Sequence, residues 1–448
     1  MACVEPQKRK EQKTTMATLK KFYKDKVLLR NLLLTAVILA VIRLFYVIPT
    51  PGVNMSYFKA LLESNDALSF MDTLTGNGLS NLSVMMLNVT PYITASIIMQ
   101  LMSNVFTKLR DMQRGMRDEQ KRYEKITVIL GIILAFAEST ALSIGYGQKG
   151  MFIEYQWYWI LLVAAIWTAG AAFSSIMGKF IHDKFDLNGT SLILLLNILA
   201  GYPSDAKSLY TAFMEGEETP VMLGIGLILL LVIIALFIFS YYIQESERPI
   251  KINYSTKTSI TGNKQTGEFP IKLCPGSVVP VIFASSIMTT PVLVASAFVD
   301  TSGLWAQILS PSCWFTPDNW LPTIGAGIYV LLIFGFSFYY VSLTMDPKEI
   351  AENLKKNGGT IAGIRPGQST AQYLKKRIYE VVALGAVALI IIALIPVVLS
   401  GIFSLSRTAF LGTSVIITVG VMCEIKHYIL AHIRQVGYSP VMNKGGLF

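Results

Sequence analysis

Apolar residues in this chain fall into blocks of roughly 20, the length of helix that crosses the hydrocarbon core of a bilayer. Only 15% of the residues are charged, compared with about 25% in soluble domains. The pattern predicts an all-α membrane protein with ten transmembrane helices. The predicted spans are residues 31–48, 82–105, 126–145, 157–178, 188–202, 221–243, 278–299, 323–345, 381–403 and 408–430.

The distribution of Lys and Arg predicts the orientation of these spans. With the N-terminus in the cytoplasm, 33 of the 38 basic residues fall on the cytoplasmic side and four on the outside. Cytoplasmic loops of membrane proteins carry such an excess. Both termini are therefore expected in the cytoplasm, and the net charge of +10 is attributed to basic loops rather than to nucleic-acid binding.

Ten spans divide into two halves of five, and two such halves of one chain have opposite orientations. This geometry permits an inverted repeat with a path between the halves, although no strong internal sequence repeat is visible. The expected parts are a basic cytoplasmic N-terminal segment (1–30), an N-terminal half (31–205), a C-terminal half (206–430) with cytoplasmic loops at 244–277 and 346–380, and a cytoplasmic tail (431–448).

Ionisable residues within the predicted spans are few. Arg43 lies in the first span and Glu138 in the third, whereas transporters commonly bury charged ligands for ions near the midplane. The three histidines and four cysteines are scattered, so neither a metal site nor a disulfide framework is expected. No catalytic cluster or phosphate-binding loop is visible. The sequence therefore predicts no enzyme, no cofactor and no coupled-ion site.

Seven short strings occur in order along the chain, cover nearly its whole length and fall on the predicted spans and loops. They are Arg43 with Ile48-Pro-Thr-Pro-Gly52, Thr90-Pro-Tyr-Ile-Thr-Ala-Ser-Ile-Ile-Met-Gln100, Asn188-Gly-Thr-Ser191 through Pro203, Arg248-Pro-Ile-Lys-Ile-Asn-Tyr254, Pro280-Val-Ile-Phe-Ala-Ser-Ser286, Asp346-Pro347 through Gly363-Ile-Arg-Pro-Gly367, and Gly412-Thr-Ser414. These strings resemble those of the SecY family, the central subunit of the bacterial-type Sec translocation channel.

The resemblance implies a clamshell of two inverted five-helix halves around a pore for unfolded polypeptides. Its waist would be a ring of aliphatic side chains, and a short plug helix at about 68–81 would close it. A narrow apolar ring excludes water and ions, yet it does not bind any one peptide sequence tightly. The ring residues carried over are Val89, Ile93, Leu194, Ile282 and Ile417, and the plug residues are Phe70, Leu74, Gly76, Gly78 and Leu79.

The family also opens sideways, between the second span and the seventh and eighth, so that hydrophobic segments reach membrane lipid. Polar residues on these spans are the candidates for this lateral gate, although packing between helices would equally explain them. The candidates are Thr94, Gln100, Ser286 and Thr290.

The two long basic loops are expected, by resemblance, to dock the SecA ATPase and the ribosome. The docking candidates are Arg248, Lys251, Lys257, Lys355, Lys356 and Arg365. Further implied partners are SecE-like and SecG-like subunits and an unfolded polypeptide that carries a signal sequence. Departures from the family pattern, such as Asn88 where many relatives have Gly, leave open an accessory SecY for a restricted set of clients. A secondary transporter of a small solute is the alternative from another class.

Overall fold

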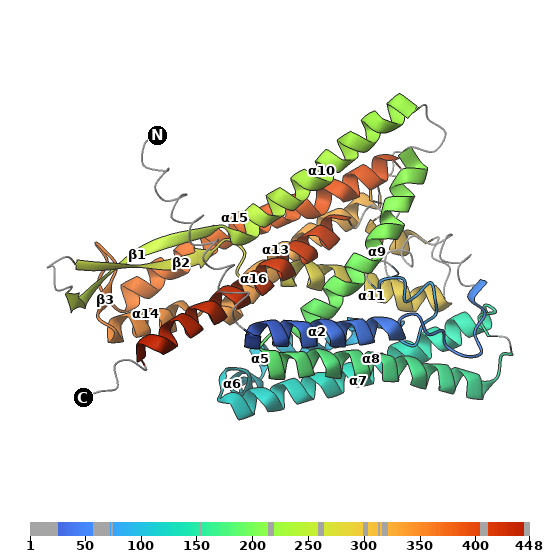
Figure 1. Ribbon diagram of the computed structural model, residues 1–448, viewed down its shortest axis with the longest axis horizontal. Coiled ribbons are helices and arrows are strands. Elements are labelled where there is room, and N and C mark those ends of the chain that lie inside the picture. Colours follow the sequence, from blue (N-terminus) through green and yellow to red (C-terminus); the bar gives the residue numbers. More distant parts are fainter. Residues whose placement is uncertain are drawn as a thin grey trace.

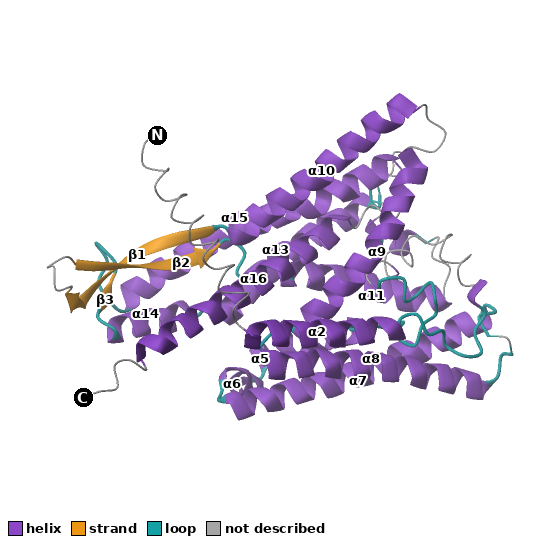
Figure 2. Cartoon of the chain, in the orientation of Figure 1, coloured by secondary structure: helices purple, strands orange, loops and turns teal. Residues whose placement is uncertain are grey.

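Long helices dominate the computed structural model, which describes residues 26–56, 72, 75–152, 154–213, 219–258, 264–298, 303–311, 314–315, 321–403 and 411–442 (Figures 1 and 2). Each of the predicted apolar ranges overlaps one long helix. These helices are α2 (Lys26–Phe45), α5 (Thr90–Val105), α7 (Arg117–Gln148), α8 (Trp157–Phe185), α9 (Gly189–Phe213), α10 (Thr219–Glu245), α11 (Val279–Phe298), α13 (Thr323–Thr344), α15 (Gln368–Phe403) and α16 (Leu411–Met442).

Six helices within the described residues are long and apolar enough to cross a membrane, by length and composition alone. They are α2, α7, α8, α13, α15 and α16. Exposed aliphatic and aromatic side chains cover much of their surface. Such a surface suits lipid rather than water, because each buried CH₂ gains about 0.8 kcal/mol on leaving water. The chain is therefore a multi-pass membrane protein.

The helices pack in two groups. The first helix group consists of α2, α5, α7 and α8, and the second of α10, α13, α15 and α16 (Figure 1). Helix α9 contacts α2 and α8 on one side and α16 on the other, while α11 contacts α5 and α7 as well as α13. The two remaining long helices thus join the groups, and the largest buried apolar cluster lies where they meet α15 and α16.

The second predicted span begins later than expected. Residues 82–89 form a series of turns, and α5 starts only at Thr90. Leu82 and Asn88 have φ angles of 42° and 52°, in the left-handed region that a continuous helix excludes. Pro91 then occupies the first turn of α5, where its missing N–H costs nothing. Hydropathy could not reveal this break, because the residues before it are mostly apolar.

Other boundaries also differ from the predicted ones. Helix α15 begins at Gln368 instead of 381, and α16 continues to Met442, well into the predicted tail 431–448. The boundary predicted between the halves, at 205, lies inside α9. Apolar blocks mark only the part of a helix that lies in lipid, whereas the hydrogen-bonded helix continues through polar residues.

A three-stranded sheet lies at one end of the molecule (Figure 2). Strands β1 (Glu247–Thr258) and β2 (Lys264–Lys272) form an antiparallel hairpin. Strand β3 (Gly359–Thr360) pairs with β1 through Asn253 and Tyr254. The sheet therefore joins the two basic loops, which the sequence presented as separate. Short helices α6 (Thr107–Arg114), α12 (Leu304–Leu309) and α14 (Pro347–Lys356) complete the fold.

Candidate functional site

A cavity of about 290 Å³ lies where α9, α11 and α16 meet. Each of these helices contributes one of the predicted ring residues to its wall: Leu194, Ile282 and Ile417. The wall also includes the polar side chains of Lys272, Ser277, Glu424 and His427. Ile417 and His427 stand about 15 Å apart along α16. The cavity thus leads from the sheet end of the molecule to the apolar middle.

The five predicted ring residues, called here the collar (Val89, Ile93, Leu194, Ile282 and Ile417), lie in adjoining apolar clusters. Val89, Ile93 and Leu194 are buried in one cluster, and Ile417 is buried in the next. Ile282 is half-buried and packs against both. Four separate elements thus bring these side chains to one region, and Ile282 is the one of the five that packs against both clusters.

Only part of the predicted plug lies within the described residues. Phe70 and Leu74 lie outside them, whereas Gly76, Gly78 and Leu79 lie in turns instead of a helix. Leu79 is fully buried in an apolar cluster with side chains of α7 and α8. Gly76 has a φ of 64°, and a Cβ atom there would lie 2.7 Å from the backbone oxygen of Asn197. The described part of the plug is therefore seated directly on α9.

The predicted lateral-gate residues lie on helices that touch, since α5 contacts α11. The hydroxyl of Thr94 donates to the carbonyl of Thr90, and the amide of Gln100 donates to Ser96, so these bonds stay within α5. Ser286 and Thr290 lie on α11, where the Thr290 hydroxyl is buried and has no hydrogen-bond partner among the described residues.

A tyrosine that the sequence did not single out forms a bond between α13, the helix of the eighth predicted span, and α5. The hydroxyl of Tyr339 on α13 donates to the backbone carbonyl of Gln100 at 2.5 Å. Its only signal in the sequence was a hydroxyl-bearing aromatic side chain within the eighth predicted span, and several tyrosines share that signal. The partner could not be found from the sequence because it is a backbone oxygen.

The predicted docking residues gather around the sheet. Arg248, Lys251 and Lys257 belong to β1, and the side chains of Arg248 and Lys251 are exposed. Lys251 lies between Ile250 and Ile252, which point to the other face of β1 and are buried against α14 and α15. Lys355 and Lys356 end α14, and Arg365 follows β3, all three exposed. Basic residues more than 100 positions apart in the sequence therefore gather around one sheet.

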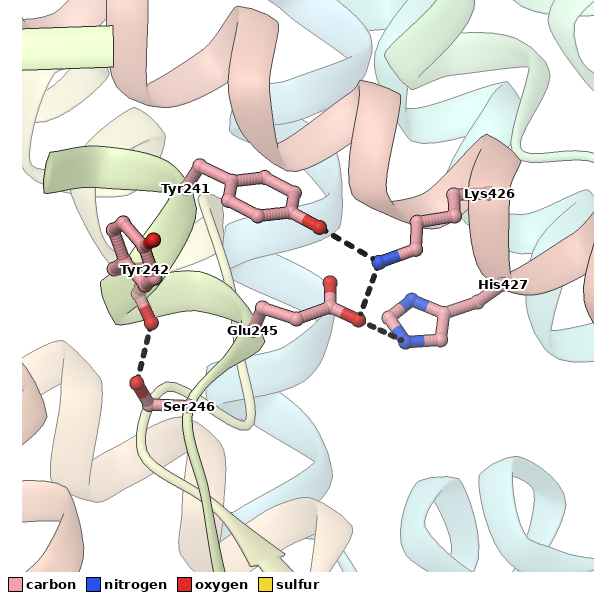
Figure 3. Close-up of polar contacts among 6 residues, drawn as sticks. All are labelled: Tyr241, Tyr242, Glu245, Ser246, Lys426 and His427. Atoms are coloured by element: carbon pink, nitrogen blue, oxygen red, sulfur yellow. Dashed lines mark hydrogen bonds and ion pairs between the residues drawn. The ribbon is translucent and has the colours of Figure 1, made fainter. Parts of the chain in front are cut away.

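Polar contacts fix α16 against α10 at the sheet end (Figure 3). The ammonium of Lys426 donates to a carboxylate oxygen of Glu245 at 2.8 Å and to the hydroxyl of Tyr241 at 2.9 Å. Nε2 of His427 lies 3.5 Å from the same oxygen of Glu245. Helix α16 carries Ile417, so these contacts also hold the collar.

Gln244 supports the same helix closer to the collar. Its amide nitrogen donates to the carbonyl of Ile416 at 3.0 Å, and its oxygen accepts a bond of 3.1 Å from the hydroxyl of Ser277. The side chain therefore links α10, the segment before α11 and the backbone beside Ile417. Gln244 does not stand out in the sequence, since a polar residue at the end of an apolar block is common.

Cys274 lies in the cavity wall between β2 and α11. Its side chain is 6% exposed, and burial raises the pKa of the thiol to about 12. The thiol is therefore protonated at neutral pH and behaves as a small apolar group. No group of three or more His, Cys, Asp or Glu side chains that could hold a metal ion occurs within the described residues.

The chain is similar to known proteins over most of its length. A family model described as SecY matches residues 83–426. The protein translocase subunit SecY of Thermotoga maritima is 32% identical over 430 residues, which cover 93% of this chain and 95% of that protein. The subunit of the same name from Streptococcus gordonii is 31% identical over 436 residues, covering 95% and 98%.

Two solved structures share the fold. One, described as a protein-conducting channel, has a TM-score of 0.61 at 18% identity, covering 89% of this chain and 90% of that one. The other is Sec61 in the canine ribosome–channel complex from the endoplasmic reticulum, with a TM-score of 0.59 at 17% identity and the same coverage. At these identities the likeness concerns the fold alone.

Proposed function

The chain belongs to the SecY family, and from this we propose that it is the pore-forming subunit of a channel that conducts unfolded secretory polypeptides across a membrane. The observation that carries the proposal is the cavity that leads from the polar sheet end to Leu194, Ile282 and Ile417. A path with one polar, accessible end and one apolar end suits a chain that enters from water and meets a seal.

The collar supplies that seal. Its side chains are aliphatic, and a narrow aliphatic constriction loses its water and so blocks ions. Branched aliphatic side chains change rotamers without breaking hydrogen bonds, so the ring widens around a passing peptide of any sequence. A charged ring would hold oppositely charged segments, because the Coulomb energy rises steeply in a low dielectric.

In this proposal, all ten long helices span the membrane and form two inverted halves, with both termini in the cytoplasm. Support comes from the bias of Lys and Arg toward one side and from the two helix groups. The halves meet along α5 and α11, where Thr94, Gln100, Ser286 and Thr290 lie. Separation of these helices gives hydrophobic segments a path into lipid, where they partition by their own hydrophobicity.

The basic surface around the sheet is the proposed docking site for a SecA-type ATPase or a ribosome. The chain itself catalyses no reaction, so the energy for transport comes from that partner. Ribosomal RNA and acidic protein surfaces both complement exposed Lys and Arg side chains. SecE-like and SecG-like subunits complete the proposed complex, since much of the apolar helix surface is exposed in the chain alone.

A site-specific crosslinking experiment tests the proposal. A photoreactive residue replaces Ile282, in the cavity wall, or Ile287, exposed on the same helix. A secretory precursor is arrested during transport through the purified complex in liposomes. We expect strong crosslinks from position 282 and weak ones from 287. Equal crosslinking from both, or flux of a small solute through liposomes that hold the chain alone, would contradict the channel.

A further inference from the structure

A chain of buried polar side chains lies beside the collar. Tyr46 at the end of α2, Asn88 before α5 and Asn197 in α9 are all almost completely buried. The hydroxyl of Tyr46 donates to Oδ1 of Asn88 at 2.5 Å and accepts a bond of 3.0 Å from Nδ2 of Asn197. The hydroxyl thus uses its one proton and one lone pair to join three elements that are far apart in the sequence.

Arg43 extends these contacts to the plug. Its guanidinium donates to the carbonyl of Gly76 at 2.8 Å, and it lies 5.3 Å from the centre of the Tyr46 ring. Gly76 itself rests on the backbone of Asn197, with no room for a Cβ atom. Arg43 and Asn197 therefore hold the same plug residue, and Tyr46 connects them.

The position of these residues relates them to the pore. Asn88 directly precedes Val89, and Asn197 lies about one turn beyond Leu194 on α9. Tyr46 belongs to the same buried cluster as Val89, Ile93 and Leu194. A movement that widens the collar by separating α9 from the start of α5 therefore pulls apart the two asparagines that Tyr46 joins.

The closed arrangement does not satisfy every polar atom. Nδ2 of Asn88 and Oδ1 of Asn197 are buried and have no hydrogen-bond partner in the part of the chain that the structure describes. An unpaired amide in an apolar interior is costly, and water would relieve that cost. The contacts through Tyr46 favour the closed state, whereas the two unpaired atoms favour a wetted, open one.

We propose that Tyr46 is the centre of a latch, formed with Arg43, Asn88 and Asn197, that holds the collar and the plug closed in the resting channel. The inference rests on the proposed channel function and adds its regulation. The latch releases when an arriving polypeptide separates α9 from α5, and water entering the pore then solvates the freed amides. Tyr46 acts through the elements it joins and is a positioning residue.

The main test replaces Tyr46 with Phe, which keeps the ring and removes the hydroxyl. The variant is reconstituted as the complete complex, and the resting ion conductance is measured per folded channel. We expect a rise of about 25-fold, since the hydroxyl makes two hydrogen bonds and each lost bond shifts a two-state equilibrium by about fivefold. Tyr329→Phe is the matched control, because Tyr329 is similarly buried and its hydroxyl also forms a hydrogen bond with a buried side chain, that of Ser285.

A second variant separates the latch from simple stability. Asn88 has a φ of 52°, which Gly adopts readily, so Asn88→Gly relieves the backbone and removes the acceptor. The latch predicts a higher resting conductance with undiminished recovery of folded complex. A purely structural role for the bond predicts less folded complex and unchanged conductance per channel.

Gly76→Ala tests the seat of the plug. The new methyl group would meet the backbone of Asn197 and should raise the resting conductance. Gly150→Ala is its control, because Gly150 also has a positive φ, of 96°, but has no atom within 4 Å of the new methyl group. We expect wild-type conductance from this control.

Two results would overturn the latch. One is a wild-type resting conductance in both Tyr46→Phe and Asn88→Gly. The other is an equal rise in the Tyr329→Phe control. Both conductances are measured in preparations whose wild-type complex transports a secretory precursor. A wild-type complex that transports none contradicts the proposed channel function instead, so the two failures are distinguishable.

Discussion

The hydroxyl of Tyr339 and the backbone carbonyl of Gln100 form a hydrogen bond of 2.5 Å between α13 and α5. The two residues are 239 positions apart and belong to different helix groups. The bond therefore crosses the contact that must open if hydrophobic segments leave the channel sideways. Because the acceptor belongs to the backbone, only the donor can be removed by substitution.

Tyr339→Phe should make the lateral gate open more easily. Loss of one partly buried hydrogen bond costs the closed contact about 1 kcal/mol, a factor of roughly five in the opening equilibrium. We expect the variant to export a precursor whose signal sequence is too weakly hydrophobic for the wild-type complex. The measurement is the fraction of that precursor secreted. Tyr242→Phe, at a tyrosine exposed on α10, is the control, and equal export by both variants would argue against the gate role.

Shortening a collar side chain should weaken the seal. Ile282→Ala removes three carbon atoms from a residue that packs against both apolar clusters. We expect a higher resting ion conductance of the complex in planar bilayers. Ile287→Ala makes the same change at an exposed position of α11 outside the cavity wall and should leave conductance unaltered. An Ile282→Ala channel as tight as the wild type would exclude this residue from the seal.

Reversing one charge at the sheet end should uncouple the channel from its partner. Arg365 is exposed, and its carbonyl accepts a bond of 2.9 Å from Thr370 at the start of α15, so its backbone position is fixed. We expect Arg365→Glu to insert normally and to lower secretion at least tenfold, an effect in the range of a lost charge pair at an interface.

The control for Arg365 reverses an exposed charge on another predicted cytoplasmic segment. Lys121→Glu on α7 changes the net charge by the same amount, away from the sheet. Secretion by this variant should remain near the wild-type level. Equal loss in both variants would indicate a general charge effect, and normal secretion by Arg365→Glu would remove the docking role.

Cys274 should be almost inert toward thiolate-specific reagents. Burial raises the pKa of its thiol to about 12. A raised pKa means less thiolate at a given pH, so at pH 8 the thiolate fraction is roughly a thousandfold below that of a free cysteine. Mass spectrometry after maleimide treatment should find Cys274 unmodified in the folded complex and modified in detergent-denatured protein. Rapid labelling of the folded, resting complex would show that the cavity wall is open to reagent.

Much of the fold was predictable because each long apolar block needs only its own residues to form a hydrogen-bonded helix. Boundaries were less predictable. The break before α5 depends on left-handed residues such as Asn88, and hydropathy does not detect a backbone angle. The joining of the basic loops by β3 was also invisible, because a strand of two residues carries no periodic signal.

Individual site residues depended on partners far away in the chain. Collar residues such as Ile282 look like any other apolar residue in a helix, and motif resemblance alone distinguished them. Tyr46 and Gln244 were missed, because only their hydrogen-bond partners distinguish them. Tyr46 bonds Asn88 and Asn197, and Gln244 bonds the carbonyl of Ile416.

The sequence by itself determined that the chain folds as long helices in a membrane, because the length and spacing of apolar blocks are set by bilayer thickness and by backbone hydrogen bonding within each segment. Only the tertiary structure decided which side chains face one another. Side-chain packing and polar contacts between helices depend on residues separated by tens to hundreds of positions. The cavity, the collar and the contacts of Tyr46 therefore appear only when α2, α5, α9, α11 and α16 come together.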